Sequence, residues 1–289
     1  MAFWKGSRPL PEIDRASPID YLMCVMDVGP IPLQVGAVVR FASGPAVALE
    51  DLRQRVAERA RATPKLRQRL VKSPLGCGWP VWVDDPGFDI AAHVQQMSCP
   101  APRDDRALMS LASRLVTARL PPERPLWLIM LVTELVDESS ALVAVLHHCL
   151  ADGLGGVAVL RNLADGAPAL ATELQEFPRR RPAAGALFLN AVTMKLEAAR
   201  HPERLIRSLR GAWRDVVNHE LPRSPRSSLI RAGGQRRELV IARAQLRQVR
   251  AAASAAGGRP DDIVLCAAAG ALGRVASARG EKVTHVVAG

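Results

Sequence analysis

The sequence predicts an α/β fold, in which hydrophobic strands alternate with amphipathic helices along the chain. Residues 33–41 are apolar and β-branched, as expected of a strand, and residues 47–63 then follow a helical pattern. Two further apolar runs, 125–135 and 140–146, are separated only by the polar residues 136–139. We interpret these two runs as neighbouring buried strands joined by a short connection.

Three helices are predicted from apolar residues that recur every three or four positions. In the first, Leu52, Val56 and Ala60 share one face, and Pro64 ends the helix. The other two carry stripes made of Leu108, Leu111, Ala112 and Leu115, and of Leu154, Val157, Leu160 and Leu163. The last stripe begins soon after the strand at 140–146, so we expect a strand-to-helix corner between them.

The pattern changes after Gly166, and we predict three regions: 1–175, a linker region 176–234, and 235–289. The linker region contains arginines at helical spacing, namely Arg200, Arg204, Arg207, Arg210 and Arg214. This segment is either a basic amphipathic helix suited to a membrane surface or an ordinary packed helix with solvated arginines, and we prefer the second interpretation. The last region is predicted to hold a strand at 238–241 and helices at 244–256 and 261–278.

Composition is typical of a folded domain. The chain has 289 residues, 48% of them hydrophobic and 23% charged, which excludes wholesale disorder. No signal peptide follows Met1, and no run of about twenty apolar residues predicts a spanning helix. The cysteines are odd in number and include no CxxC pair, so we predict no disulfide framework, no metal site and a reducing compartment. They are Cys24, Cys77, Cys99, Cys149 and Cys266.

The net charge is +11, from 39 lysines and arginines against 28 aspartates and glutamates. Such a charge attracts anionic lipid head groups or the phosphates of a nucleotide-bearing cofactor. Nucleic acid is not an expected partner, because no binding motif is present and aromatic residues make up only 4% of the chain. A coding bias toward arginine and alanine accounts for the charge equally well.

One segment has the residues of an acid–base site. His147, His148, Cys149, Leu150, Ala151, Asp152 and Gly153 directly follow the apolar run 141–146. An imidazole titrates near neutrality, so it can accept a proton from a hydroxyl and return one to a leaving group. Asp152 can orient the segment through hydrogen bonds, and Gly153 permits a tight turn. Two histidines at the end of a buried strand suit this chemistry better than they suit packing.

The segment 147–153 resembles the HHxxxDG signature of acyltransferases related to chloramphenicol acetyltransferase and to the condensation domains of peptide synthetases. Other segments, in the same order, resemble the bacterial wax ester synthase/diacylglycerol acyltransferase family: 17–20, 64–70, 80–85 and 122–127. The resemblance covers about 10–175 and resumes around 235–280, where 261–265 is similar to a family helix. It implies a chloramphenicol-acetyltransferase-like α/β sandwich.

The resemblance also implies an activity and roles for the site residues. The expected reaction is transfer of a long-chain acyl group from acyl-coenzyme A, as cosubstrate, to diacylglycerol or a long-chain alcohol, with no permanently bound cofactor. His148 would be the general base, His147 would shape the site, and Asp152 with Gly153 would fix the loop. Cys149 is a less favoured nucleophile. Three residues of the neighbouring strand are expected to be structural: Pro125, Leu126 and Trp127.

The chain departs from the family pattern at Arg119, Pro121 and Pro260. Because the family has two similar halves, we expect a complete N-terminal half, an incomplete C-terminal half, and activity that is weakened unless a second chain completes the fold. The expected location is cytoplasmic, at a membrane or lipid-droplet surface. Two alternatives stay open: a condensation-type enzyme that uses a carrier-protein thioester, and a non-catalytic lipid-associated protein.

Overall fold

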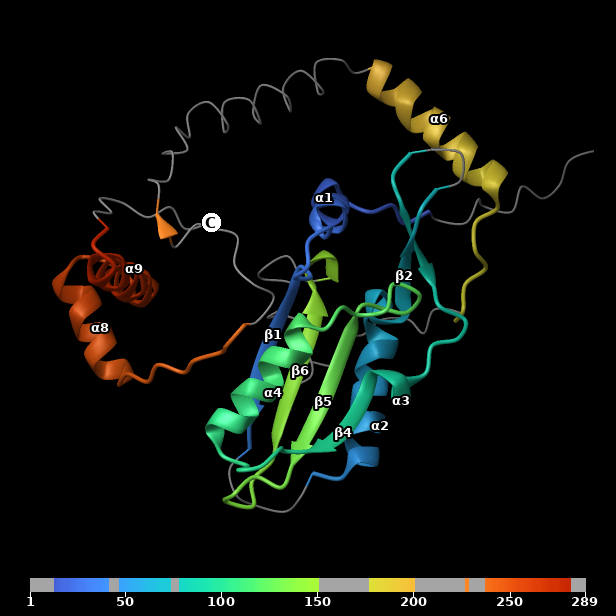
Figure 1. Cartoon of the computed structure of the whole chain (residues 1–289). Helices are drawn as coiled ribbons and strands as arrows, with labels where there is room; N and C mark the ends of the chain where they lie inside the picture. The colour runs from blue at the N-terminus through green and yellow to red at the C-terminus, as the bar shows by residue number, and fades with distance from the viewer. Residues whose placement is uncertain are drawn as a thin grey trace, which may run out of the picture. The chain divides into compact units, whose positions relative to one another are not determined.

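The computed structural model describes residues 13–41, 47–73, 78–150, 177–200, 227–228 and 237–281, and its elements are labelled in Figure 1. The chain divides into two compact units. The first contains Met1–Leu196 and Arg236–Leu239, and the second contains Glu197–Gln235 and Val240–Gly289. The three regions predicted from the sequence remain a prediction.

A four-stranded mixed sheet forms the centre of the first unit. Its strands are β1 (Gln34–Arg40), β4 (Val94–Ser98), β5 (Trp127–Thr133) and β6 (Ala141–His147), in the order β1-β6-β5-β4. β6 pairs antiparallel with both of its neighbours, whereas β4 pairs parallel with β5. The two apolar runs are therefore neighbouring central strands, as predicted, and both are largely buried.

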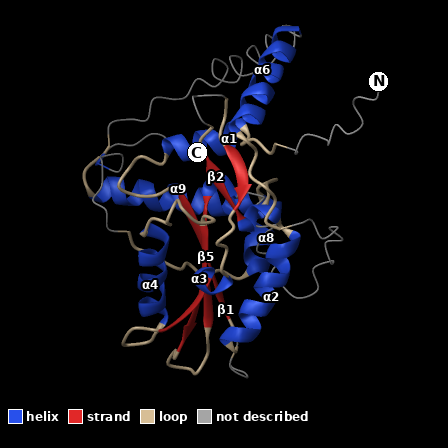
Figure 2. Cartoon of the chain, turned by 90° about the vertical axis from the view of Figure 1, so that its right-hand side faces the viewer, coloured by secondary structure: helices blue, strands red, loops and turns tan. Residues whose placement is uncertain are grey.

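Helices cover both faces of this sheet, with α4 (Asp105–Thr117) on one face and α2 (Leu49–Ala62) on the other. Figure 2 shows the strands between these two helices. Successive side chains of a strand point to opposite faces, so Val143 and Val145 pack in the α4 cluster while Leu146 packs in the α2 cluster. Burial on both faces explains why the central strands are continuously apolar.

α1 (Pro18–Met26) precedes β1 and begins with a reciprocal capping arrangement. The Ser17 hydroxyl accepts a hydrogen bond from the Asp20 backbone at 3.1 Å, and the Asp20 carboxylate accepts one from the Ser17 backbone at 3.1 Å. This capping box satisfies two amides that the helix itself cannot bond. It fixes where α1 begins, and the helix ends one residue before Asp27.

Most of the remaining elements of the first unit form a smaller layer. They are η1 (Pro64–Arg67), β2 (Gln68–Val71), β3 (Val81–Asp84) and α6 (Ala184–Arg200), which belongs to this unit up to Leu196. α3 (Ile90–His93) packs instead beside α2 and β5. β2 and β3 form a two-stranded antiparallel sheet. Arg15 fastens α6 to this layer, because its guanidinium donates to the Asn190 side chain at 2.7 Å and to the Leu187 carbonyl at 2.9 Å.

The second unit contains α8 (Leu246–Ala255) and α9 (Pro260–Ala278), which confirm the two helices predicted there. The strand predicted at 238–241 is wrong, because residues 237–245 are irregular. A strand needs a neighbour for its backbone groups, and within the described residues none pairs with this run; Val240 is 84% exposed. The stripe at 154–163 and the arginine series beyond Arg200 lie outside the described residues.

Among the helices that the structure describes, none has the length and apolar character needed to cross a membrane.

Candidate functional site

The two histidines of the motif lie where β6 ends. His147 is the last residue of β6, and His148 begins the short 3-10 turn η3 (His148–Leu150). The chain is held on both sides here, because the His147 amide donates to the Leu126 carbonyl at 3.0 Å and the His148 amide donates to the Leu33 carbonyl at 2.9 Å. The backbone of both histidines is thus fixed by the neighbouring segments.

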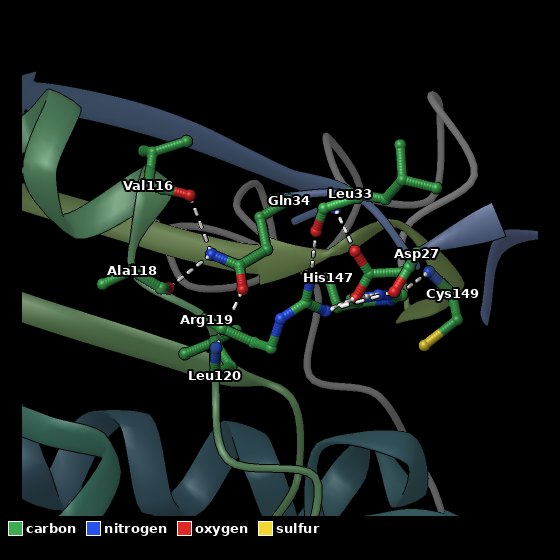
Figure 3. A network of polar contacts seen from close by, with 10 residues as sticks. Asp27, Leu33, Gln34, Val116, Ala118, Arg119, Leu120, His147 and Cys149 are labelled. Carbon is green, nitrogen blue, oxygen red and sulfur yellow. Dashed lines mark hydrogen bonds and ion pairs between the residues drawn. The ribbon is translucent and has the colours of Figure 1, made fainter. Parts of the chain in front are cut away.

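Both ring nitrogens of His147 are engaged by the protein (Figure 3). The Cys149 backbone amide donates to Nδ1 at 3.1 Å, and Nε2 lies 3.3 Å from the Asp27 carboxylate. Since Nδ1 accepts a hydrogen bond, the proton of the neutral ring is on Nε2, which donates to Asp27. The tautomer and the orientation of this imidazole therefore follow from its two partners.

Asp27 connects the end of α1 to this histidine. One of its carboxylate oxygens accepts the Leu33 amide at 2.9 Å, and the other accepts both His147 and the Arg119 guanidinium. Arg119 also donates to the Gly29 carbonyl at 2.8 Å. The Asp27 side chain is only 10% exposed. A buried carboxylate needs such partners, because an unpaired charge is costly to remove from water.

Gln34 fixes the segment that carries Arg119. Its side-chain amide donates to the carbonyls of Val116 and Ala118 at 2.8 and 2.9 Å, and its carbonyl accepts the Leu120 amide at 2.9 Å. Gln34 is also the residue of β1 that pairs with His147. One strand position therefore ties the connection after α4 to the end of β6, as Figure 3 shows.

Burial lowers the pKa of His147 below its ordinary value, and the hydrogen bond with Asp27 opposes this effect. The side chain of His147 is 5% exposed. A buried imidazole resists protonation because the charged form loses its hydration. His147 is therefore held neutral and in place, whereas the adjacent His148 is partly exposed. Of the two imidazoles, that of His148 is therefore the more exposed.

The start of β5 supports this corner, with Trp127 as its first residue and Pro125 and Leu126 just before it. The indole nitrogen of Trp127 donates to the Leu66 carbonyl at 2.7 Å, and its rings stack on His93 with centroids 4.5 Å apart. Pro125 is fully buried, and Leu126 supplies the carbonyl that accepts the His147 amide. All three residues make packing or backbone contacts here.

Cys24 comes together with His147 and Cys149, which are distant from it in sequence. One potential ligand atom from each of the three residues lies within 4.8 Å of the others. Two thiols and an imidazole are a ligand set that soft divalent metals accept. The sequence predicted no metal site, because the cysteines are dispersed along the chain. Asp152 and Gly153 lie outside the described residues, so their predicted roles remain predictions.

Sequence reasoning missed Asp27, Gln34 and Cys24, and it noticed Arg119 only as a departure from the family pattern. Asp27 precedes Val28, Gly29 and Pro30, and an aspartate before such residues is ordinary turn chemistry. No local pattern distinguishes it from other aspartates. Only its position opposite His147 reveals its role.

Comparison with known proteins identifies the family. Residues 16–264 match the family described as the wax ester synthase/diacylglycerol acyltransferase catalytic domain. A Mycobacterium tuberculosis protein named as a probable diacylglycerol O-acyltransferase is 36% identical over 135 residues, which are 47% of this chain and 29% of that protein. A second so named in the same bacterium is 32% identical over 184 residues, covering 62% of this chain and 68% of its own length.

The fold is similar to that of a solved structure from Marinobacter aquaeolei VT8, a wax ester synthase/diacylglycerol acyltransferase. The TM-score is 0.57 at 22% identity, with 87% of this chain and 57% of that protein covered. This likeness shows the predicted α/β acyltransferase fold. The chain spans less than a third of the first of these relatives and more than half of the solved structure. By its sequence match over 16–264, this chain belongs to the wax ester synthase/diacylglycerol acyltransferase family.

Proposed function

We propose that this chain transfers a long-chain acyl group from acyl-coenzyme A to the hydroxyl of diacylglycerol or a long-chain alcohol, with His148 as the general base. The observation that carries the proposal is the different environment of two adjacent histidines within a family of acyltransferases. His147 has both nitrogens engaged by Asp27 and Cys149, whereas His148 is partly exposed at the start of η3.

In this mechanism, the His148 imidazole takes the proton of the acceptor hydroxyl as its oxygen attacks the thioester carbonyl. The C–O bond forms, the C–S bond then breaks, and the imidazolium returns the proton to the leaving thiolate. One base serves both half-reactions, so no covalent acyl-enzyme is needed. His147 holds the turn from which His148 projects, through the Cys149 amide at 3.1 Å.

The test uses the purified 289-residue chain with palmitoyl-coenzyme A and either hexadecanol or dioleoylglycerol. Ester product and released coenzyme A thiol are both measured. His148→Ala is expected to lower turnover by about a hundredfold or more, the scale of a lost general base. His147→Ala should cost less. An active His148→Ala variant with an unchanged pH profile would contradict the assignment.

A peripheral position at a lipid surface is the second part of the proposal. Lipid acceptors are insoluble in water, the net charge is +11, and α1 carries four exposed apolar side chains close to the site. They are Tyr21 at 42%, Leu22 at 50%, Val25 at 49% and Met26 at 56% exposure. Apolar side chains that insert between head groups, together with basic residues, are how reversible lipid binding is achieved.

Flotation with anionic and neutral vesicles tests this part. Binding is expected to favour anionic vesicles and to weaken with salt, because the Debye length is only about 8 Å at physiological ionic strength and shorter above it. The double variant Leu22→Gln/Met26→Gln should bind less. Val136→Gln serves as the control, since Val136 is 71% exposed in the connection between β5 and β6. Equal binding to both vesicle types, or to neither, would exclude a charge-assisted surface position.

A further inference from the structure

Two thiols from distant parts of the sequence meet beside His147. Cys24 lies in the last turn of α1, and Cys149 lies in η3, which α1 contacts directly. Their sulfur atoms lie within 4.8 Å of each other. The other described cysteines are placed differently: Cys99 is in the core beside α4 and Cys266 is exposed on α9.

The two thiols differ in the direction of their pKa shifts and in their exposure. A hydrogen bond from Cys149 lowers the pKa of the Cys24 thiol. The same hydrogen bond, together with burial, raises the pKa of Cys149. Cys24 is half-buried, while Cys149 is 2% exposed. A partly exposed cysteine whose sulfur lies beside that of a second, buried cysteine is the arrangement of oxidant-sensitive sites, in which the second thiol resolves the oxidised first one.

A metal ion is the less suitable occupant of this cluster. To bind it, His147 would have to release either the Cys149 amide from Nδ1 or the Asp27 carboxylate from Nε2. Oxidation of the thiol pair needs neither nitrogen of His147 as a ligand, because the two sulfur atoms already lie within 4.8 Å of each other. The two thiols can therefore bond to each other without recruiting His147.

We propose that Cys24 and Cys149 form a reversible disulfide that locks α1 onto η3 and switches off the catalytic turn. With hydrogen peroxide as oxidant, the Cys24 thiolate attacks one peroxide oxygen, an S–O bond forms, the O–O bond breaks, and the hydroxide that leaves takes up a proton to become water. Cys149 then attacks the Cys24 sulfur, an S–S bond forms, and hydroxide leaves with the thiol proton as water. Overall, two thiols lose two electrons and two protons, and hydrogen peroxide becomes two waters. A dithiol reductant reverses the change.

Closing the bond must move the turn that holds the histidines. The sulfur atoms have to approach to about 2.05 Å, which draws Cys149 toward α1. The amide of the same residue orients His147 through its bond to Nδ1, and His148 is the residue before it. Displacement of Cys149 therefore disturbs both imidazoles. The effect on turnover rests on the proposed function, whereas formation of the disulfide does not.

Peptide mapping tests the disulfide directly. The reduced full chain is treated with hydrogen peroxide, alkylated and digested with trypsin. Cys24 and Cys149 then lie in the separate peptides 16–40 and 120–161, each with a single cysteine. We expect these two peptides to be crosslinked to each other and to be separated by dithiothreitol. Cys24→Ala and Cys149→Ala should abolish it, and Cys266→Ser should leave it unchanged. Crosslinks through other cysteines, or oxidation of Cys24 without a crosslink, would overturn the proposal.

Two further measurements test the lock. Backbone hydrogen exchange in peptides 16–40 and 120–161 should slow in the crosslinked protein, and turnover should fall by about tenfold or more and recover with dithiothreitol. Each variant is compared with its own reduced form. If crosslinked protein had unchanged hydrogen exchange and unchanged turnover, the disulfide would not fix α1 to η3 and this part of the proposal would be wrong. A crosslink with slowed exchange but no turnover in either form would contradict the proposed function alone. Inhibition by zinc without a crosslink would replace the disulfide with a metal site.

Discussion

At the scale of single residues, the site depends on one buried carboxylate. Asp27 accepts hydrogen bonds from the Leu33 amide, from Arg119 and from His147. It thereby joins the end of α1, the start of β1, the connection after α4 and the end of β6. His147 directly precedes His148, and its ring orients the η3 turn through the Cys149 amide. Asp27 is therefore a positioning residue that acts through His147.

The variant Asp27→Asn tests this role. Loss of the charge weakens the bonds to Arg119 and His147, and a hydrogen bond to a charged group is worth about 1.5–3 kcal/mol. We expect kcat to fall by about tenfold or more with little change in KM. Asp137→Asn is the matched control, because Asp137 pairs with Arg40 at the opposite end of β6. Thermal melting of both variants checks that they fold, and a change in KM alone would contradict the positioning role.

Buried histidines predict how stability depends on pH. Burial lowers the pKa of His93 and of His147 below the ordinary value of 6.5. The unfolded state then binds a proton more readily than the folded state. The contribution of these two histidines to the free energy of unfolding is therefore fully present above pH 6.5 and is lost as pH drops from 6.5 toward the lowered pKa. Asp137 and Glu281, with pKa values of about 2, titrate below this window.

Urea unfolding followed by tryptophan fluorescence at about pH 7.5 and about pH 5.5 measures this dependence. His93→Gln should reduce the difference between the two conditions, and the contribution of His147 should remain. Stability that rises on acidification across this range would contradict the assignment of a lowered pKa to these two groups.

At the scale of secondary structure, the close approach of α4 to β1 depends on a glycine. A Cβ added at Gly36 would lie 2.3 Å from Cγ2 of Val116, which belongs to α4. No side chain fits this space unless the Val116 side chain or α4 itself moves. Because α4 leads into the segment that carries Arg119, its seating on β1 also positions the site.

Gly36→Ala is expected to lower the free energy of unfolding by about 1–3 kcal/mol, the usual cost of an overpacked contact. Val116→Ala in the same chain should restore part of the loss by opening the space. Gly185→Ala is the control, because an added Cβ there meets no atom within 4 Å and alanine favours the α6 helix. Equal effects of the two glycine variants would exclude close packing as the cause.

At the scale of the whole molecule, the second unit presents apolar side chains to solvent. Leu246 on α8 is 57% exposed, and Val264 and Leu265 on α9 are 62% and 59% exposed. Leu272 on α9 is also exposed, at 39%, while Val249 and Ile263 are partly buried. Neighbouring exposed apolar residues mark surfaces that associate.

We expect the purified chain to self-associate as its concentration rises. Light scattering coupled to size-exclusion chromatography measures this, and the double variant Val264→Gln/Leu265→Gln should shift the protein toward monomer. Val136→Gln, in the first unit, is the control for a general gain in solubility. A concentration-independent monomer, with the wild-type and double variant alike, would show that these side chains do not associate.

The sequence alone determined the elements whose burial is local and periodic. The apolar runs predicted β5 and β6, the three-to-four-residue stripes predicted α2 and α4, and the HHxxxDG pattern predicted the family. These succeed because one face of each helix and both faces of each central strand must be apolar. β4 escaped prediction, because its polar residues Gln95 and Gln96 lie on the exposed edge of the sheet. The strand expected at 238–241 failed because apolar residues form a strand only beside another one.

The contacts of the histidines were decided by the tertiary structure. The side chain of Asp27 meets those of Arg119 and His147 because β1 pairs with β6 and Gln34 anchors the connection after α4. Cys24 and Cys149 meet because α1 lies on η3. A hydrogen bond or a pKa depends on distances between atoms that are far apart in the chain, and periodicity along the chain carries no information about them. The sequence could name the histidines, but only folding chose which carboxylate and which thiol lie beside them.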